Sequence, residues 1–147
     1  MSVGFEFRET MSGSYHLLDA PDRERAISFT IRAVVHDLLR FLRDRKAEIA
    51  GEVDVEGFAD HRPMRGSLTF DPLFGKELIY DFAFPGNDDR KLRFYGKKSV
   101  ELLRPLATMT TLPGQLLGPG GEVLGEARLR FDARSDLAKW LRSFKPT

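Results

Sequence analysis

Residues 27–33 read Ile-Ser-Phe-Thr-Ile-Arg-Ala, an unbroken alternation of apolar and polar side chains. Successive side chains of a β-strand point to opposite faces, so this pattern predicts a strand with one buried and one solvent-facing side. The same alternation recurs along the chain, in Phe5–Met11, Ile49–Val55, Leu68–Phe70, Leu78–Phe84, Leu92–Phe94 and Val123–Phe131, with a weaker strand expected at Leu106–Leu112. The repetition indicates a mainly β protein with about eight strands, each contributing one apolar face.

Turn-forming residues separate these strands at the expected places. Pro85–Asp89 (Pro-Gly-Asn-Asp-Asp) predicts a hairpin loop, and Pro119–Gly121 precedes the last strand. A doubly wound α/β sheet would need a helix between successive strands, and the chain has room for only two helices. We therefore expect an antiparallel barrel (lipocalin-like) or a sandwich, as a single domain over residues 1–147.

The first predicted helix is short and lies at His36–Arg45 between two strands. Its apolar side chains, expected to pack toward the sheet, are Leu38, Leu39, Phe41 and Leu42. The second is a C-terminal helix with one apolar stripe, formed by Leu137, Trp140, Leu141 and Phe144.

Composition excludes several classes of protein. The chain has no cysteine, which rules out disulfides, thiolate catalysis and thiol-based metal sites. Its 23 basic and 22 acidic residues are interspersed, without the basic face of a nucleic-acid-binding protein. We find no apolar run that would serve as a secretory signal or membrane span, so we expect a cytoplasmic protein without an integral membrane segment.

Two charged residues fall on the apolar side of the alternation. Glu9 has the parity of Phe7 and Met11, and Lys98 has the parity of Phe94. An unpaired charge in a protein core costs several kcal/mol, so we expect Glu9 and Lys98 to meet inside the barrel or to flank its mouth. They would form a buried ion pair that fixes strand register, or a polar anchor for a ligand headgroup, unless a β-bulge turns one of them to solvent.

Catalytic and metal-binding motifs are missing from the sequence. His16, His36 and His61 lie far apart, and no Gly-x-Ser-x-Gly nucleophile motif occurs. We therefore predict no metal site, no cofactor and no enzymatic activity.

Several short motifs resemble a known protein segment. They are Phe7-Arg-Glu9-Thr-Met11-Ser-Gly13, Tyr80-x-Phe82, Leu92-x-Phe94-x-Gly96-x-Lys98 and Thr110-Thr111-Leu112. Together they resemble the β-rich accessory segment of bacterial cholesterol-oxidase-like (GMC-type) flavoenzymes and associated lipid hydrolases. The resemblance implies a role near lipid or sterol substrates, and Glu9 and Lys98 fall on recurrent positions of its pattern. It transfers no chemistry, because the dinucleotide motif Gly-x-Gly-x-x-Gly and a catalytic histidine–asparagine arrangement are absent.

Twelve phenylalanines, many on the inward parity, favour an apolar interior. An eight-stranded barrel either is filled by side chains or holds one small ligand. The leading hypothesis is a non-catalytic barrel that binds a hydrophobic or amphipathic small molecule (lipid or sterol-like) or assists a lipid-modifying enzyme. The predicted ligand-binding residues are Glu9, Lys98, Phe7, Met11, Phe29, Tyr80, Phe82 and Phe94.

Two alternatives stay open on the sequence alone. One is a protein-interaction module with a solid core, and exposed edge strands would also allow a homodimer. The other is a small enzyme with Glu9 as general base and Lys98 tuning its pKa.

Overall fold

The computed structural model of this chain describes residues 4–71, 77–99, 111–130 and 145–146. Its elements, in chain order, are β1 (Phe5–Leu17), β2 (Ala20–Val35), α1 (Leu38–Asp44), β3 (Lys46–Val55), β4 (Ala59–Asp71), β5 (Glu77–Pro85), β6 (Lys91–Ser99), β7 (Thr111–Leu117), β8 (Val123–Arg130) and β9 (Lys145–Pro146). The short β9 pairs with the beginning of β1.

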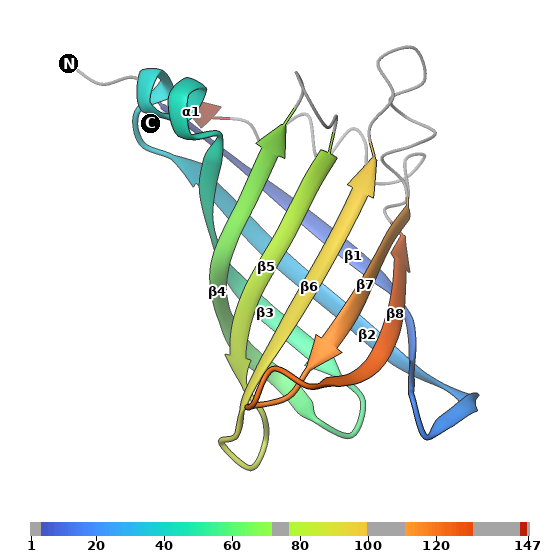
Figure 1. The fold of residues 1–147 in the computed structure, drawn as a ribbon. Coiled ribbons are helices and arrows are strands. Elements are labelled where there is room, and N and C mark those ends of the chain that lie inside the picture. The colour runs from blue at the N-terminus through green and yellow to red at the C-terminus, as the bar shows by residue number, and fades with distance from the viewer. Residues whose placement is uncertain (1–3, 72–76, 100–110, 131–144, 147) are drawn as a thin grey trace.

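Strands β1 to β8 form a closed antiparallel barrel (Figure 1). Each strand pairs with the next along the chain, and β1 pairs with both β2 and β8. Met11 lies opposite Phe29 of β2, and Gly13 lies opposite both Ile27 of β2 and Leu129 of β8. The barrel prediction is thus confirmed in preference to a sandwich. Each of these eight strands has a neighbouring strand on both sides, although within the described residues Phe7–Met11 of β1 pair only with β2. The expected homodimer stays a prediction.

The predicted strands that lie within the described residues are present, and several are longer than the alternation indicated. β1 and β2 continue to a tight turn at Leu18 and Asp19, through a segment whose residues 21–24 are exposed. A strand segment with two polar faces shows no alternation of apolar and polar residues, so the sequence pattern could not predict it.

Two predicted elements fall wholly or partly outside the described residues. The strand expected at Leu106–Leu112 overlaps β7 only from Thr111 onward. The predicted C-terminal helix, with its stripe of Leu137, Trp140, Leu141 and Phe144, lies outside the described part of the chain.

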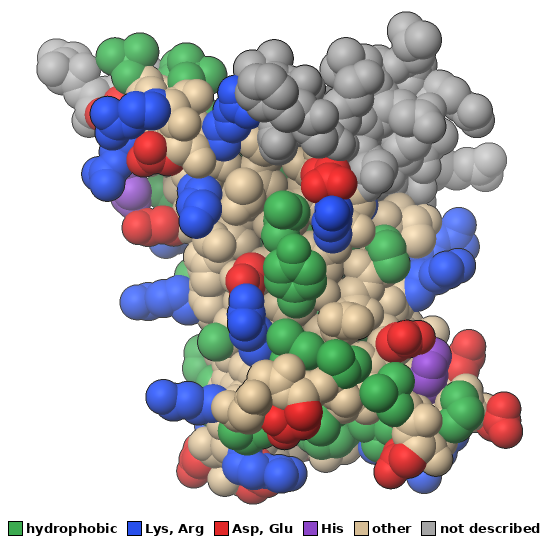
Figure 2. Space-filling model, in the orientation of Figure 1, with side chains coloured by type: hydrophobic (Ala, Val, Ile, Leu, Met, Phe, Trp, Pro, Cys, Tyr) green, Lys and Arg blue, Asp and Glu red, His purple; other side chains and the backbone are tan. Residues whose placement is uncertain are grey.

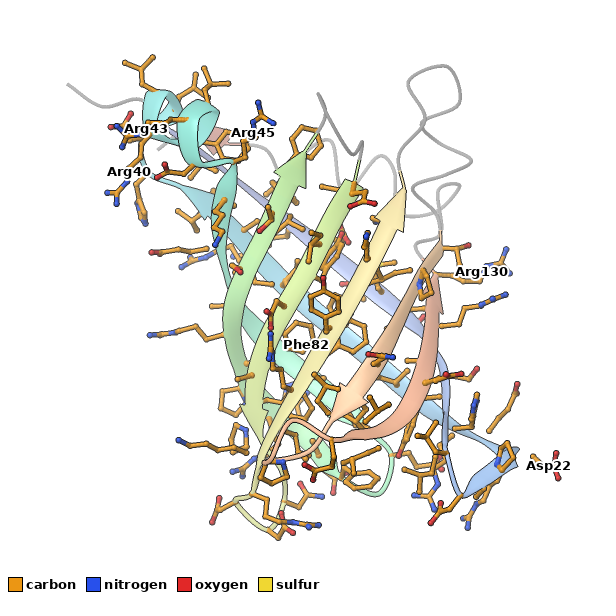
Figure 3. All side chains as sticks on the ribbon, in the orientation of Figure 1. Asp22, Arg40, Arg43, Arg45, Phe82 and Arg130 are labelled. Atoms are coloured by element: carbon orange, nitrogen blue, oxygen red, sulfur yellow. The ribbon has the colours of Figure 1, made fainter. Side chains whose placement is uncertain are left out.

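The middle of the barrel is filled by aromatic rings. The ring centroids of Phe82 and Phe94 are 5.1 Å apart, and those of Phe29 and Phe82 are 5.2 Å apart. Phe29 also lies 5.8 Å from Phe94, so the three rings form one cluster within the barrel (Figure 3, where Phe82 is labelled). Each side chain is at most 1% exposed. The inward parity read from the sequence therefore produces a packed core at this level.

Close approach between strands lets the barrel curve. A methyl group at Gly51 would overlap the carbonyl oxygen of Thr30, and one at Gly66 would overlap that of Asp81. Glycine inside a strand commonly marks such close backbone contact. The two residues thus occupy positions where the neighbouring strand leaves no room for a side chain.

Four turns lie at the end of the barrel opposite α1, at residues 18–19, 56–58, 86–90 and 118–122 (Figure 1). We call this end the hairpin end. Here the N–H of Asn87 donates to the carbonyl of Phe58 at 2.8 Å, and the N–H of Asp60 donates to the Asn87 side chain at 2.8 Å. The Tyr15 hydroxyl, from inside the barrel, donates to the carbonyl of Glu56. Hydrogen bonds thus connect the loops of this end to one another and to β1.

The inserted helix is present as α1, but the predicted packing of its leucines is wrong. Asp37 caps the helix by accepting from the N–H groups of Leu39 and Arg40. Only Phe41 packs against the core, whereas Leu39 is 79% and Leu42 62% exposed, and Leu38 is 38% exposed. A seven-residue helix is about 10 Å long and touches its support along one side only. α1 sits at the rim of the barrel, and Phe41 occupies the side of the helix that contacts the core.

Among the described residues, no helix has the length and apolar content that a membrane crossing requires.

Truncation of a central ring should strongly destabilise the barrel. We expect Phe82→Ala to lower the free energy of unfolding by about 3–5 kcal/mol, because its ring contacts would be replaced by a cavity. Leu18→Ala, at an exposed turn, should change it by no more than about 0.5 kcal/mol. Urea unfolding followed by circular dichroism measures both, and equal effects would contradict the packed-core description.

Candidate functional site

Glu9 and Lys98 both point into the barrel, as their parity predicted. Their exposures are 8% and 4%, and they are the two buried charged side chains among the described residues. Glu9 lies opposite Ile31 on β2, and Lys98 lies opposite Leu78 on β5. Two regular strands on different sides of the barrel therefore carry an acid and an ammonium into the same interior.

Tyr80 of β5 connects the two charged residues. Its hydroxyl donates a hydrogen bond of 2.7 Å to Oε1 of Glu9. The Nζ of Lys98 lies 5.1 Å from the centroid of the Tyr80 ring, within the range of a cation–π contact. Glu9, Tyr80 and Lys98 are called the polar cluster below. The expected meeting of Glu9 and Lys98 inside the barrel thus takes place around a tyrosine.

Sequence reasoning selected Tyr80 as an apolar lining residue and missed its hydroxyl. The sequence did contain an indication of this hydrogen bond. Tyr80 shares parity with Phe82 and Phe84, which predicts that it is buried, and a buried tyrosine hydroxyl usually has a hydrogen-bond partner. Which residue the hydroxyl meets depends on how β5 and β1 face each other across the barrel. Alternation along a single strand gives no information about that arrangement.

Burial controls the protonation of the cluster. Desolvation raises the pKa of Tyr80 well above its ordinary value, and the adjacent Glu9 carboxylate raises it further. Tyr80 therefore keeps its proton at neutral pH and remains a donor. Desolvation lowers the pKa of Lys98, while the negative charge of Glu9 opposes that shift. The buried ammonium is less stable than one in water, and Glu9 is the charge that supports it.

Toward the α1 end, the inward-facing residues include small and half-buried side chains beside larger buried ones such as Val35, Leu68 and Leu78. Ala33 lies opposite Phe7, and Ala47 lies opposite Leu68. Phe7 and Phe70 are only half-buried there, and both pack against the core. The polar cluster is therefore bordered by aromatic packing on one side and, toward α1, by a mixture of small, half-buried and larger buried apolar residues.

The structure divides the predicted ligand-binding residues into two groups. Phe29, Phe82 and Phe94 fill the middle of the barrel through contacts with one another, and Met11 is fully buried opposite Phe29. Glu9, Tyr80 and Lys98 form the polar cluster, with Phe7 nearer the α1 end of β1. Tyr80 belongs to both, because its ring lies 6.0 Å from that of Phe29.

The described structure includes two grooves, and the one beside α1 is lined in part by the core residues Val35 and Ala47. One, of about 720 Å³, extends over β1 and β6–β8 and includes His16, Tyr95 and Arg128. The other, of about 680 Å³, lies between α1 and the adjacent strands and includes His36, Phe41 and Glu48. Neither groove is lined by Glu9 or Lys98. Within the described ranges, no three histidine, aspartate or glutamate side chains are placed to hold a metal ion.

Comparisons with protein-family models, curated proteins and solved structures found no significant match for this chain. The resemblance to accessory segments of cholesterol-oxidase-like flavoenzymes therefore stays a prediction.

The Tyr80 hydroxyl should stabilise the folded state through Glu9. We expect Tyr80→Phe to lower the free energy of unfolding by about 1.5–3 kcal/mol, because a buried carboxylate would lose a donor. Tyr95→Phe is the matched control, since Tyr95 is half-buried on the outer face of the adjacent strand β6. Urea titration measures both variants, and a neutral Tyr80→Phe would contradict the described hydrogen bond.

Lys98 should give the protein a specific pH dependence. Between the lowered pKa of Lys98 and the ordinary value of 10.5, the unfolded chain binds a proton that the folded chain has released. The contribution of Lys98 to the free energy of unfolding therefore rises with pH across this window and is least favourable below it. This rise should be absent in Lys98→Met and retained in Lys97→Met, whose lysine is half-exposed beside Glu77.

The measurement is urea unfolding from pH 7 to pH 11, taken as the difference between wild type and each variant. At alkaline pH, ionisation of Tyr80 in the unfolded chain lowers the free energy of unfolding of wild type and variants alike. Taking the difference between them removes this effect. A difference between wild type and Lys98→Met that does not change with pH would show that the pKa of Lys98 is not lowered.

Proposed function

We propose that this protein is a non-catalytic barrel that binds one amphipathic, lipid-like or sterol-like molecule in the half of its interior nearest α1. The polar cluster of Glu9, Tyr80 and Lys98 is the observation that carries the proposal. In this proposal the polar group of the ligand meets the cluster, and its apolar part lies against Phe7 and Phe70.

The energetics of the cluster support a binding role. Placing an acid and an ammonium in an apolar interior costs several kcal/mol per ion, and apolar residues of similar size often give a barrel at least as stable. Strongly perturbed ionisable groups gather at binding and catalytic sites. A ligand headgroup that accepts from Lys98 or donates to Glu9 would account for charges that the fold does not need for stability.

The ring cluster determines where such a ligand would lie. Phe29, Phe82 and Phe94 occupy the middle of the barrel, so a ligand along the whole barrel axis would have to displace them. The inward residues nearer α1 include Ala33 and Ala47, which fill less space. We therefore place the ligand between the ring cluster and the α1 end of the barrel, with the polar cluster at the inner end of the ligand.

Two features favour binding over catalysis. Glu9 is 8% exposed and one of its oxygens already accepts from Tyr80, whereas a general base needs access to the proton that it removes. Tyr80 with a raised pKa is a poor acid at neutral pH. If the barrel serves a lipid-modifying enzyme, as the resemblance implies, we propose that it holds or presents the ligand.

Native mass spectrometry tests the proposal directly. We expect the purified protein to carry, or to take up, one fatty acid or sterol per chain. Lys98→Met and Glu9→Gln should each weaken binding at least about tenfold, which corresponds to about 1.4 kcal/mol for a lost interaction with a buried charge.

Lys97→Met is the matched control, because Lys97 neighbours Lys98 but lies on the outer face beside Glu77. It should bind as wild type does. Absence of any complex with fatty acids and sterols would reject the proposal and favour the alternative of a solid-core interaction module. Equal weakening by Lys97→Met and Lys98→Met would show that binding occurs outside the barrel.

A further inference from the structure

Helix α1 presents a compact apolar surface to solvent. Leu38, Leu39 and Leu42 are 38%, 79% and 62% exposed and are called the leucine patch. At about 100° of rotation per residue, these three side chains lie within one side of the helix. The other exposed large apolar residues of the described chain lie at the hairpin end, where Leu18 is in a turn and Val123 begins β8.

Basic side chains border the leucine patch. Arg40 and Arg43 are 72% and 77% exposed, and Lys46 follows the helix at its C-terminal end. Residues 37–46 contain four basic and two acidic residues, in a chain whose overall net charge is only +1. Asp37 is engaged as the N-cap, and Asp44 lies 3.4 Å from Arg40 and 3.3 Å from Arg43. Figure 2 shows hydrophobic and basic side chains next to one another at this end, and Figure 3 labels Arg40, Arg43 and Arg45.

The orientation of the patch is fixed by the barrel. Phe41, about 60° around the helix from Leu38 and about 160° from Leu39, packs against the core. The helix ends at Asp44 and is capped by Arg45. The N–H of Arg45 donates to the carbonyl of Phe41, and its carbonyl accepts from the N–H of Phe70 on β4. An anchored helix loses little conformational freedom when its exposed side is covered, so the leucine patch is ready to bind.

We propose that α1 docks on the surface of an anionic lipid bilayer. The three leucines would enter the boundary between headgroups and acyl chains, and Arg40, Arg43 and Lys46 would contact the anionic headgroups. An apolar helix side bordered by basic residues is the usual combination for interfacial membrane binding. The proposal does not depend on ligand binding inside the barrel, although α1 lies at the end that we assign to the ligand.

Two other occupants fit the patch less well. A helix of seven residues is short for the grooves that bind amphipathic helices, which contact side chains over two or more turns. A second copy of this chain, docked through the same patch, would place Arg40 and Arg43 near their own equivalents, and like charges oppose such contact. A bilayer with anionic headgroups has neither problem.

A single fluorescent probe can locate the contact, because the chain has no cysteine of its own. We would label Leu42→Cys with an environment-sensitive dye and add vesicles of phosphatidylcholine, with or without phosphatidylglycerol. The dye should shift to shorter wavelength with the anionic vesicles and much less with the neutral ones. The same dye at Leu18→Cys, at the hairpin end, should show no shift.

The second arm measures binding by co-sedimentation with the same vesicles. The double variant Leu39→Ser with Leu42→Ser should lose at least about tenfold in bound fraction, while Leu18→Ser should bind as wild type does. Both changes are at exposed positions, so the thermal unfolding midpoint should be retained and confirms folding of each variant.

Three outcomes would overturn the proposal. One is absence of wild-type binding to anionic vesicles, and another is binding that survives the double variant. The third is concentration-dependent dimerisation in solution that the double variant abolishes, since this would assign the patch to a second copy. Failure of the fatty acid and sterol experiment would leave all three readouts unchanged, so the two proposals can fail separately.

Discussion

Pairing of β1 with both β2 and β8 is the constraint on which the rest of this structure depends. Once the sheet closes on itself, every inward side chain of the eight strands enters one shared space, and an apolar residue on any strand can contact one from any other. The ring cluster of Phe29, Phe82 and Phe94 joins strands β2, β5 and β6 in this way. Closure also requires the strands to curve, which Gly51 and Gly66 permit by leaving space for neighbouring carbonyl groups.

The same closure makes the polar cluster energetically significant. On an open sheet, Glu9 and Lys98 could reach water by bending around an edge. Inside the barrel they are removed from water, and their charges are stabilised by protein groups, among which the Tyr80 hydroxyl and ring are prominent. The raised pKa of Tyr80 and the lowered pKa of Lys98 express this desolvation. Burying these charges costs free energy, and this is the physical reason for proposing a binding role for the cluster.

The two ends of the barrel differ in ways that suit different roles. The hairpin end has loops connected by hydrogen bonds among Phe58, Asp60 and Asn87. The α1 end has the polar cluster in its half of the interior and an anchored helix with exposed leucines at its rim. Interior binding and surface contact would therefore meet at one end of the molecule, while the ring cluster separates that end from the other.

Local periodicity alone determined the strands and the inward direction of Glu9 and Lys98, because the alternation of side chains is a property of one strand and needs no partner. The turn at Pro85–Asp89 was predictable for the same reason, since turn preferences act within a few residues. Barrel closure, the partnership of Tyr80 with Glu9 and the filling of the middle by rings were decided only by the tertiary structure, since each depends on how distant strands are aligned. The leucines of α1 show the limit most clearly. Their apolar character predicted packing, but only the tertiary structure decided that Phe41, and not the leucines, contacts the core at the rim of the barrel.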